Sequence, residues 1–299
     1  VSGCGGAGSV ELLTHTVKGP SLVVAPLGDI QWSGKDGMTT QDHLKRHIDA
    51  MLERGAYFLG MGDYIDFLSP SNRQRLRGAA LYDTAEDVID AKGLELVHEL
   101  YEKFLKPTVG RWIGLLEGHH YSQFRAGDTS DMRLCQMLKV PFLGTTACVR
   151  VQFMKSTVSY GSAILWAHHG ARGAGSTQGA ALNELQQVAA SWEGVDVFFM
   201  GHVPKGVLAP LNRPFPYWPG RGIGQPMLVH KTVYLVRCGG FSKSYVQGAK
   251  QGQIPRGGYA EQRAMSPGFI GAPVVTFHMI RTQTDGHDRH ELRTTVEVS

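Results

Sequence analysis

The sequence lacks any apolar run that approaches the roughly 20 residues a helix needs to cross a bilayer. Its first residues also lack the basic, apolar and small-residue regions of a secretory signal. Its 4 cysteines are scattered without CxxC spacing, which argues against a zinc knuckle and against a disulfide framework. We therefore expect a cytoplasmic protein with no membrane partner, whose thiols are reduced and mostly buried.

Neither an internal repeat nor a long linker divides the 299 residues, a length that is ample for a sizeable core. Residues 1–20 begin with a glycine-rich run, so we expect a flexible lead there, with an edge strand at residues 12–17. Residues 21–299 are expected to form a single domain. The net charge of +4 permits a polyanionic substrate but does not require one.

The residues 57–66, YFLGMGDYID, are a short apolar run that ends at a glycine and is followed by Asp63 and Asp66. Such a run is typical of a buried strand. A carboxylate just past the carboxyl end of a strand lies where open α/β sheets bind their ligands. Asp63 is therefore either a helix cap or a ligand, and the rest of the chain favours the second interpretation.

Four other apolar runs, at residues 21–29, 112–120, 163–169 and 195–202, also end in metal-ligand side chains. Their ends carry Asp29 with Gln31, His119 with His120, His168 with His169, and His202. We expect the five strands to converge on one edge of a sheet. Carboxylates mixed with imidazoles suit Mn²⁺, Fe or Zn²⁺ better than Ca²⁺.

Between these strands, the apolar spacing predicts helices at residues 40–54, 84–105, 128–140 and 180–192. Within the second helix, Val88 and Leu94 are expected to face inward, and Gly93 is a candidate bend. Residues 142–166 have the composition of a hairpin that begins a second sheet. Strands are expected at residues 207–211, 227–237, 274–280 and 292–298, with a loop at 212–225. Residues 69–83 are a loop or a short helix.

At this point the sequence resembles the calcineurin-like metallophosphoesterase superfamily, whose motifs run DxH, GD, GNH, a lone His and GHxH at successive strand ends. Here they read Asp29-Ile30-Gln31, Gly62-Asp63, Gly118-His119-His120, His168 and Gly201-His202-Val203-Pro204. The motifs span residues 21–204. The resemblance implies an α/β fold, a four-layer αββα sandwich of two mixed sheets flanked by helices. Residues 239–273 also resemble a C-terminal stretch of phage-encoded members.

The resemblance implies a metal site with Asp63 as the carboxylate that bridges two ions. One ion would be held tightly by Asp63, His119, His168 and His202, although the sequence leaves open whether His168 or His169 is the ligand. The other would have only Asp29, Gln31 and Asp63, because Pro204 has no ligating side chain. We therefore expect a second, weaker site, with Mn²⁺ the preferred cofactor and Zn²⁺, Fe or Mg²⁺ as alternatives.

The same resemblance makes His120 the general acid for attack by a metal-bridging hydroxide on a phosphoester. The segment Gly62-Asp63-Tyr64-Ile65-Asp66 is similar to the GDYVD of serine/threonine protein phosphatases, which implies that Asp66 pairs with His120. In those phosphatases an Arg-Gly pair follows and clamps phosphate. Here Phe67 and Leu68 follow, which weakens that particular assignment.

We therefore expect a phosphodiesterase or nuclease whose phosphoester substrate, with nucleic acid as one candidate, is attracted by arginines. The candidates are Arg73, Arg75, Arg77 and Arg172. Two alternatives stay open: a phosphomonoesterase or protein phosphatase, and a one-metal protein that binds a phosphate-containing ligand without turnover. The sequence does not predict the oligomeric state.

Overall fold

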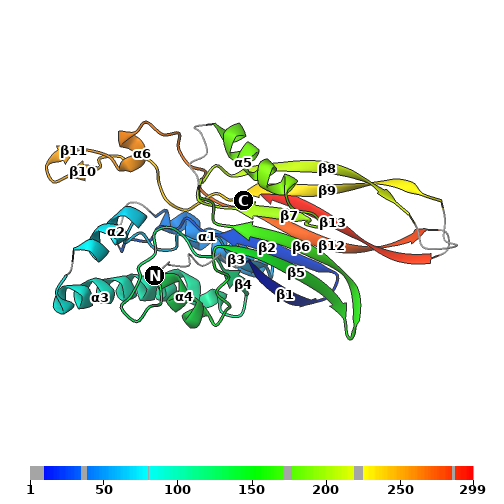
Figure 1. Cartoon of the computed structure of the whole chain (residues 1–299), viewed down its shortest axis with the longest axis horizontal. Coiled ribbons are helices and arrows are strands. Elements are labelled where there is room, and N and C mark those ends of the chain that lie inside the picture. The colour runs from blue at the N-terminus through cyan, green and yellow to red at the C-terminus, as the bar shows by residue number, and fades with distance from the viewer. Residues whose placement is uncertain are drawn as a thin grey trace, which may run out of the picture.

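The computed structural model describes residues 10–34, 39–79, 81–171, 177–218, 225–284 and 287–298. Two large mixed sheets pack face to face, and helices cover the outer face of each (Figure 1). This four-layer αββα arrangement confirms the predicted fold class. No helix in the described ranges is long and apolar enough to span a membrane. Of the described cysteines, Cys135, Cys148 and Cys238 are free.

The first sheet carries half of the candidate site. Its order is β13-β12-β2-β3-β4. The strands β2, β3 and β4 run parallel, because helices connect them. Their side chains are almost all buried, as expected for strands that are covered on both faces. The bounds are β13 (His287–Val298), β12 (Pro273–Thr284), β2 (Ser21–Leu27), β3 (Tyr57–Gly60) and β4 (Trp112–Leu115).

The second sheet has the order β1-β5-β6-β7-β9-β8. β5 and β6 form the predicted hairpin, and β6, β7 and β9 are mutually parallel. β1 lies at one edge, as predicted for residues 12–17, so an ordered strand occupies part of the expected lead. The bounds are β1 (Glu11–Lys18), β5 (Thr146–Lys155), β6 (Val158–His168), β7 (Val197–Met200), β9 (Met227–Arg237) and β8 (Val207–Tyr217).

The core has three parts. Apolar side chains such as Leu59, Val149 and Phe199 fill the space between the two sheets. The helices α1 (Gln41–Glu53), α3 (Asp83–Leu100) and α4 (Ser130–Leu138) cover the outer face of the first sheet. Helix α5 (Gln178–Ala190) covers the outer face of the second. The carboxyl ends of the parallel strands are left uncovered by helices, and the candidate site lies there.

The second predicted helix differs in detail from expectation. It consists of α3 followed by a π-helical turn, Tyr101–Leu105. Gly93 does not interrupt α3, which is one continuous helix from Asp83 to Leu100. A Cβ atom at Gly93 would come within 2.9 Å of Ser122 Oγ, so the glycine allows close approach of the 122–124 loop. Val88 and Leu94, which were expected inside, are exposed. The buried residues of α3 all lie in its carboxyl-terminal half: Gly93, Leu96, Val97 and Leu100. Apolar spacing alone therefore misjudged which side chains of this helix are buried.

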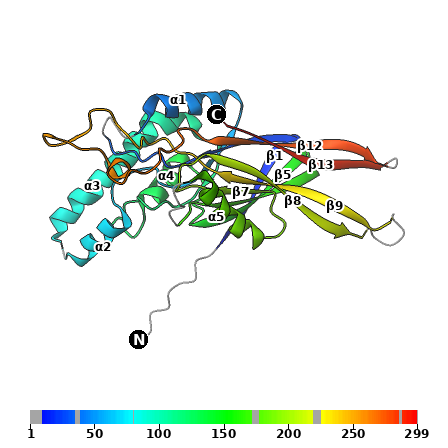
Figure 2. The ribbon, with the colours of Figure 1, turned by 90° about the horizontal axis from the view of Figure 1, so that it is seen from above.

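For residues 69–83 the structure bears out the helical alternative, whereas the loop expected at 212–225 is corrected. Residues 70–78 form a regular helix, α2 (Pro70–Gly78), that the side chain of Ser69 caps. The expected loop at 212–225 was wrong in its first half, because β8 continues to Tyr217 and pairs with Met227 on β9. The β8–β9 and β12–β13 hairpins project together from one end of the molecule (Figure 2). At the other end lie α2, α3 and a separate excursion with β10 (Lys250–Gln251), β11 (Ile254–Pro255) and α6 (Tyr259–Gln262).

Candidate metal centre

The candidate ligands follow strands of both sheets. The expectation that they would converge on one edge of a single sheet was therefore wrong. Asp29, Asp63 and His119 follow β2, β3 and β4, whereas His169 and His202 follow β6 and β7. The sheets face each other, so the two groups of strand ends meet across the inter-sheet space. Backbone hydrogen bonds join the loops at this end, for example from Asp29 N to Gly62 O at 3.0 Å.

Four predicted ligand positions have a left-handed backbone. The φ angles are 47° at Asp29, 51° at Gln31, 52° at Asp63 and 66° at His202. This region is unfavourable for residues other than glycine, and such strain collects at functional sites. The sharp turns it produces redirect each chain immediately after its strand. They therefore aim side chains of both sheets at the same place.

Three imidazoles form the centre of the site. One ring nitrogen from each of His119, His169 and His202 lies within 4.8 Å of the others. Nδ1 of His119 and Nδ1 of His202 are 3.1 Å apart, and Nε2 of His169 lies 3.3 Å from Oδ2 of Asp63. Three imidazoles and one carboxylate are a donor set that suits Zn²⁺, Mn²⁺ or Fe. The described residues therefore fit a tight metal site.

His169, and not His168, belongs to this group. Side chains alternate between the two faces of a strand. Along β6, Leu165 and Ala167 face the inter-sheet core, while Trp166 faces α5. His168 shares the face of Trp166, on which its ring stacks at 5.7 Å, and its Nδ1 accepts a hydrogen bond from Gly170 N at 2.6 Å. The next residue, His169, therefore points to the site, and its Nδ1 lies 2.6 Å from the carbonyl oxygen of Met61.

Asp63 is held rigidly by the loop that follows β4. Its Oδ1 accepts hydrogen bonds from the backbone N–H groups of His119 and His120, the second at 2.9 Å. Gly118 permits this contact, because a Cβ atom there would lie 2.0 Å from Asp63 N and 2.3 Å from Oδ1. A Cβ atom on Gly62 would likewise lie 2.7 Å from Gly118 Cα. Gly62 and Gly118 thus allow the loops after β3 and β4 to approach closely. Oδ2 of Asp63 is left to face the imidazoles.

The charges of this cluster are strongly coupled. Burial acts to raise the pKa of Asp63, but the hydrogen bond and the charge of His169 outweigh it and lower that pKa. Burial likewise acts against protonation of His169, yet the Asp63 contact raises the pKa of His169 to about 9. Burial, followed by the charge of His169, lowers the pKa of His119 and lowers that of His202 to about 4. Two neutral rings and one carboxylate thus surround a single positive charge, the role that a metal cation would take.

The second half of the predicted centre is less complete. Asp29 is buried, and its Oδ2 accepts a hydrogen bond from His202 N at 3.1 Å. Burial, opposed by the charge of His169, raises the pKa of Asp29 to about 7. Gln31 lies beside Asp63 through a 3.0 Å backbone hydrogen bond. Pro204 contributes only its carbonyl, which accepts from Phe269 N at 2.6 Å. This donor set is poorer in imidazole than the first.

His120 and Asp66 form a pair next to the cluster. Nδ1 of His120 lies 2.8 Å from Oδ1 of Asp66, the contact that the motif led us to expect. The hydrogen bond that His120 donates to Asp66 raises the pKa of His120, while partial burial opposes the shift. His120 directly follows the proposed ligand His119. Its ring is therefore held beside the imidazole cluster by Asp66.

The predicted substrate arginines have different surroundings. Nη1 of Arg73 donates to the carbonyls of Leu68, His119 and Tyr121 at 2.6, 2.7 and 2.8 Å, and the guanidinium lies 3.8 Å from the centre of the Tyr121 ring. Arg73 thus holds the 119–121 loop in place. Arg75 is exposed on α2. The side chain of Arg77 and the whole of Arg172 lie outside the described part of the chain.

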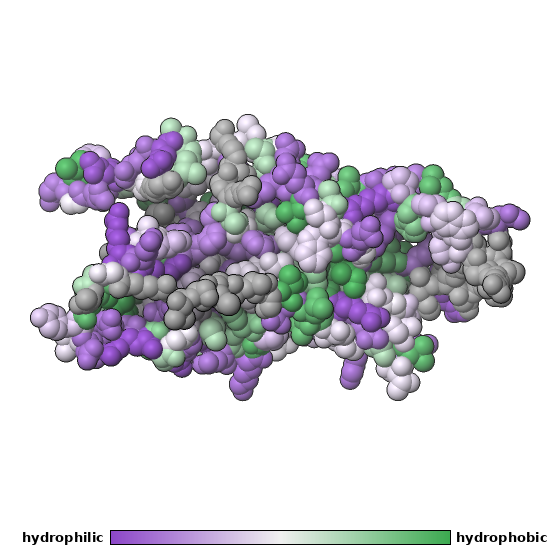
Figure 3. Space-filling model, in the orientation of Figure 1, coloured by the Kyte–Doolittle hydropathy of each residue, from purple (hydrophilic) through white to green (hydrophobic). Residues whose placement is uncertain are grey.

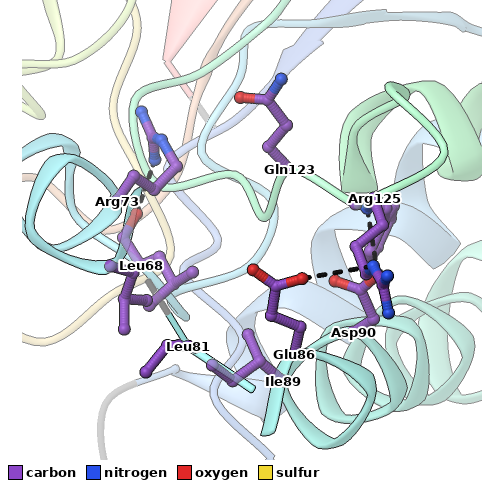
Figure 4. Close-up of a pocket in the computed structure, with 10 residues that line it drawn as sticks. Leu68, Arg73, Leu81, Glu86, Ile89, Asp90, Gln123 and Arg125 are labelled. Carbon is purple, nitrogen blue, oxygen red and sulfur yellow. Dashed lines mark hydrogen bonds and ion pairs between the residues drawn. The ribbon is translucent and has the colours of Figure 1, made fainter. Parts of the chain in front are cut away.

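A cavity of about 230 Å³ lies on the α2–α3 side of Arg73 (Figure 4). Leu68, Leu81 and Ile89 form its apolar wall, and the carboxylates of Glu86 and Asp90 face it with Gln123. Arg125 pairs with Asp83, Glu86 and Asp87, each at 3.2 Å. The acidic side chains make this cavity unfavourable for a phosphate group.

Sequence reasoning missed one residue that supports the site. Asp131, in the first turn of α4, is buried, and its Oδ2 accepts a hydrogen bond from Gly118 N at 3.0 Å. Burial raises the pKa of Asp131 to about 7, and the nearby charges of Asp63 and Glu117 act in the same direction. An aspartate in the first turn of a helix is ordinary in sequence. Nothing in its neighbours distinguished it from a solvent-exposed one.

No family model matches this chain, and no curated protein matches its sequence significantly. Among solved structures, wild-type Vps29 of Entamoeba histolytica, crystallised with zinc, is similar at 11% identity and a TM-score of 0.35, over 91% of this chain and 99% of that chain. A double mutant of the same Vps29 gives 12% identity and a TM-score of 0.33, over 92% and 99%. Both similarities are too weak to assign this chain to a family.

Proposed function

We propose that this protein is a metal-dependent phosphoesterase that hydrolyses phosphodiesters, with nucleic acid as the favoured substrate. The observation that carries the proposal is the proximity of two chemical groups on consecutive residues. His119 belongs to the imidazole and Asp63 cluster, and His120 pairs with Asp66. A cation site and a fixed proton donor, side by side, are the two elements that phosphoester hydrolysis requires.

Asp63, His119, His169 and His202 would hold the tight metal ion, and Asp29 and Gln31 the weaker one. Bound metal ions would neutralise phosphoryl oxygens and lower the pKa of a water molecule, with Mn²⁺ the proposed cofactor. The chain itself supplies the remaining steps. Asp66 holds Nδ1 of His120, so that Nε2 can present a proton to the leaving oxygen. The backbone N–H groups of His119 and His120 keep Asp63 oriented.

Arg73, Arg75, Arg77 and Arg172 remain proposed contributors to substrate binding. For Arg73 the support is indirect, because its described contacts fix the 119–121 loop. A phosphodiester is favoured over a phosphoserine or phosphothreonine substrate because Phe67 and Leu68 follow Asp66. Their side chains offer no donor to the third oxygen of a monoester.

The proposal is tested by hydrolysis of bis-p-nitrophenyl phosphate with Mn²⁺, Zn²⁺ or Mg²⁺. We expect turnover by the wild type and its loss in Asp63→Ala. Asp42→Ala, which removes an exposed carboxylate on α1, is the matched control and should leave turnover intact. A folded, metal-loaded wild type that cleaves neither this diester nor p-nitrophenyl phosphate would contradict an enzymatic role and favour a one-metal, ligand-binding protein.

A further inference from the structure

Residues 242–267 form an excursion, here called the arm, that begins and ends at the metal centre. At its start, Phe241 N donates to Asp29 O at 3.0 Å, and a Cβ atom on Gly240 would lie 2.8 Å from the Cβ of Asp29. At its end, Phe269 N donates to Pro204 O at 2.6 Å. The arm therefore starts beside the proposed ligand Asp29. It ends beside Pro204, which lies two residues after the proposed ligand His202.

The arm is anchored at its base and exposed beyond it. Ser244 Oγ accepts from Gly268 N at 2.9 Å, and the hydroxyl of Tyr245 donates to Met265 O at 2.7 Å. Lys250, Arg256 and Arg263 are exposed. The β10–β11 ladder pairs Lys250 with Pro255 and Gln251 with Ile254. The arm is thus a braced projection whose basic side chains face solvent.

Helix α2 projects from the same end of the molecule and is also connected to the centre (Figures 1 and 2). It begins four residues after Asp66, and Arg73 within it binds the carbonyls of His119 and Tyr121. In the space-filling view, the surface is notched between the arm and the α2–α3 side, and hydrophilic side chains predominate around the notch (Figure 3).

The segments that border this notch are rich in basic residues, although the arm also contains Glu261 and α3 contains Asp83, Glu86, Asp87 and Asp90. Residues 67–82 contain three arginines and no Asp or Glu. Residues 197–260, which include most of the arm, contain no Asp or Glu, while the whole chain has 26. Their basic residues are Lys205, Arg213, Arg221, Lys231, Arg237, Lys243, Lys250 and Arg256. Such an excess of basic residues in α2 and in most of the arm attracts a polyanion.

Three of these cations already have partners within the protein. Lys231 pairs with Asp196 at 2.7 Å, Arg237 is buried against Glu184, and Arg213 binds carbonyls at the end of α5. All three lie on the β8–β9 side. The exposed cations of the arm, Lys250 and Arg256, belong to the β10–β11 segment, which lies at the same end of the molecule as α2 and α3 (Figure 1).

We infer that the arm and α2 form a basic clamp that holds a single-stranded nucleic acid across the metal centre. This inference rests on the proposed function and specifies its substrate. Phosphates would contact Lys250 and Arg256 on one side and Arg75 on the other. Two exposed aromatic rings, Tyr245 on the arm and Tyr82 after α2, are 44% and 87% exposed and offer stacking faces to unpaired bases.

The test is binding of a fluorescein-labelled oligothymidylate, followed by fluorescence anisotropy in EDTA so that no cleavage occurs. The double variant Lys250→Gln, Arg256→Gln should bind roughly 10- to 30-fold more weakly at 0.1 M salt, and its log–log salt dependence should be shallower by about 1.4. The control, Arg150→Gln with Lys155→Gln, removes one arginine and one lysine exposed on β5 and should match the wild type. Tyr82→Ala should weaken binding by about 5-fold or more.

Equal binding by the arm variant and the control would overturn the inference, as would duplex DNA that binds as tightly as the single strand. Hydrolysis of bis-p-nitrophenyl phosphate by the same variants separates the two proposals. This small diester does not reach the arm, so we expect the arm variant to cleave it at the wild-type rate. Turnover of the small diester without strand binding would leave the phosphoesterase standing and remove the clamp.

Discussion

The carboxylate of Asp66 lies 2.8 Å from Nδ1 of His120, which directly follows His119 of the three-imidazole cluster. The pair joins the loop after β3 to the loop after β4. A hydrogen bond at Nδ1 fixes the orientation of the ring and leaves Nε2 as the only nitrogen able to donate a proton outward. The geometry therefore gives His120 a directional role that a solvent-exposed histidine would not have.

This relationship predicts how activity depends on the leaving group. Asp66→Asn and His120→Gln should lower kcat by about 10²- to 10⁴-fold for a diester with an alkyl leaving group, which needs protonation. The loss should be much smaller for a p-nitrophenyl ester, whose leaving group departs as an anion. Steady-state kinetics on both ester types check this prediction. An equal loss on both would mean that the pair acts by positioning and not as an acid.

The alternation of side chains between the two faces of β6 predicts which of two adjacent histidines binds metal. His169→Gln should weaken binding of Co²⁺ or Zn²⁺ by more than about 100-fold, because it removes a proposed direct ligand. Loss of a residue that only hydrogen-bonds to a ligand costs about 10- to 100-fold. His168→Gln is the control, since that ring stacks on Trp166 outside the cluster. The visible absorption of bound Co²⁺ and calorimetric titration measure both. Loss of metal binding in the His168 variant alone would contradict the structure.

Much of the fold was predictable from sequence, since short apolar runs that end in Gly, Asp or His mark buried parallel strands directly. The strand ends thereby named Asp29, Asp63, His119 and His202 as neighbours. Sequence could not decide between His168 and His169, because a one-residue ambiguity in where the strand begins reverses the two faces. Nor could it find Asp131, whose importance depends on a tertiary contact with Gly118.

The close approach of Gly118 to Asp63 predicts a severe effect of a single methyl group. Gly118→Ala would place a carbon 2.0 Å from Asp63 N, so the two loops must separate. We expect a loss of about 2 to 4 kcal/mol in the free energy of unfolding, a typical magnitude for a strained or overpacked buried site, together with loss of tight metal binding. Gly179→Ala, where a Cβ atom meets nothing within 4 Å, is the control and should be neutral or slightly stabilising. Chemical denaturation and metal titration compare the two.

The buried Asp131 predicts a pH-dependent stability. Its pKa is raised from 3.8 to about 7 in the folded protein, so its protonated form stabilises the fold at low pH. That contribution is complete below about pH 4 and is lost as the pH rises through 7. In EDTA, Asp131→Asn should therefore gain stability relative to the wild type between pH 4 and pH 7, by up to about 4 kcal/mol. Urea denaturation across this range measures the difference, and Asp42→Asn should show no such trend. A parallel pH profile for Asp131→Asn and the wild type would refute the assignment.

The incomplete donor set around Asp29 predicts that the second metal site can be improved by one substitution. Asp29 is the buried carboxylate of this site, and burial raises its pKa to about 7, so a proton competes with the metal near neutral pH. Gln31 offers only an amide oxygen, a weak ligand for Mn²⁺ or Zn²⁺. Its backbone is left-handed, with φ of 51°, and its N–H donates to the carbonyl oxygen of Asp63 at 3.0 Å. Histidine is among the residues that tolerate this backbone region.

Gln31→His should therefore raise the affinity of the second Mn²⁺ by about tenfold or more, since it replaces an amide with an imidazole. Titration followed by the electron paramagnetic resonance signal of free Mn²⁺ counts both sites and separates their affinities. The wild type should show one tight and one weak ion, and the variant two of closer affinity. The first ion should be unaffected, because His119, His169 and His202 are unchanged. Two equally tight ions in the wild type would show instead that an unconsidered ligand completes the second site.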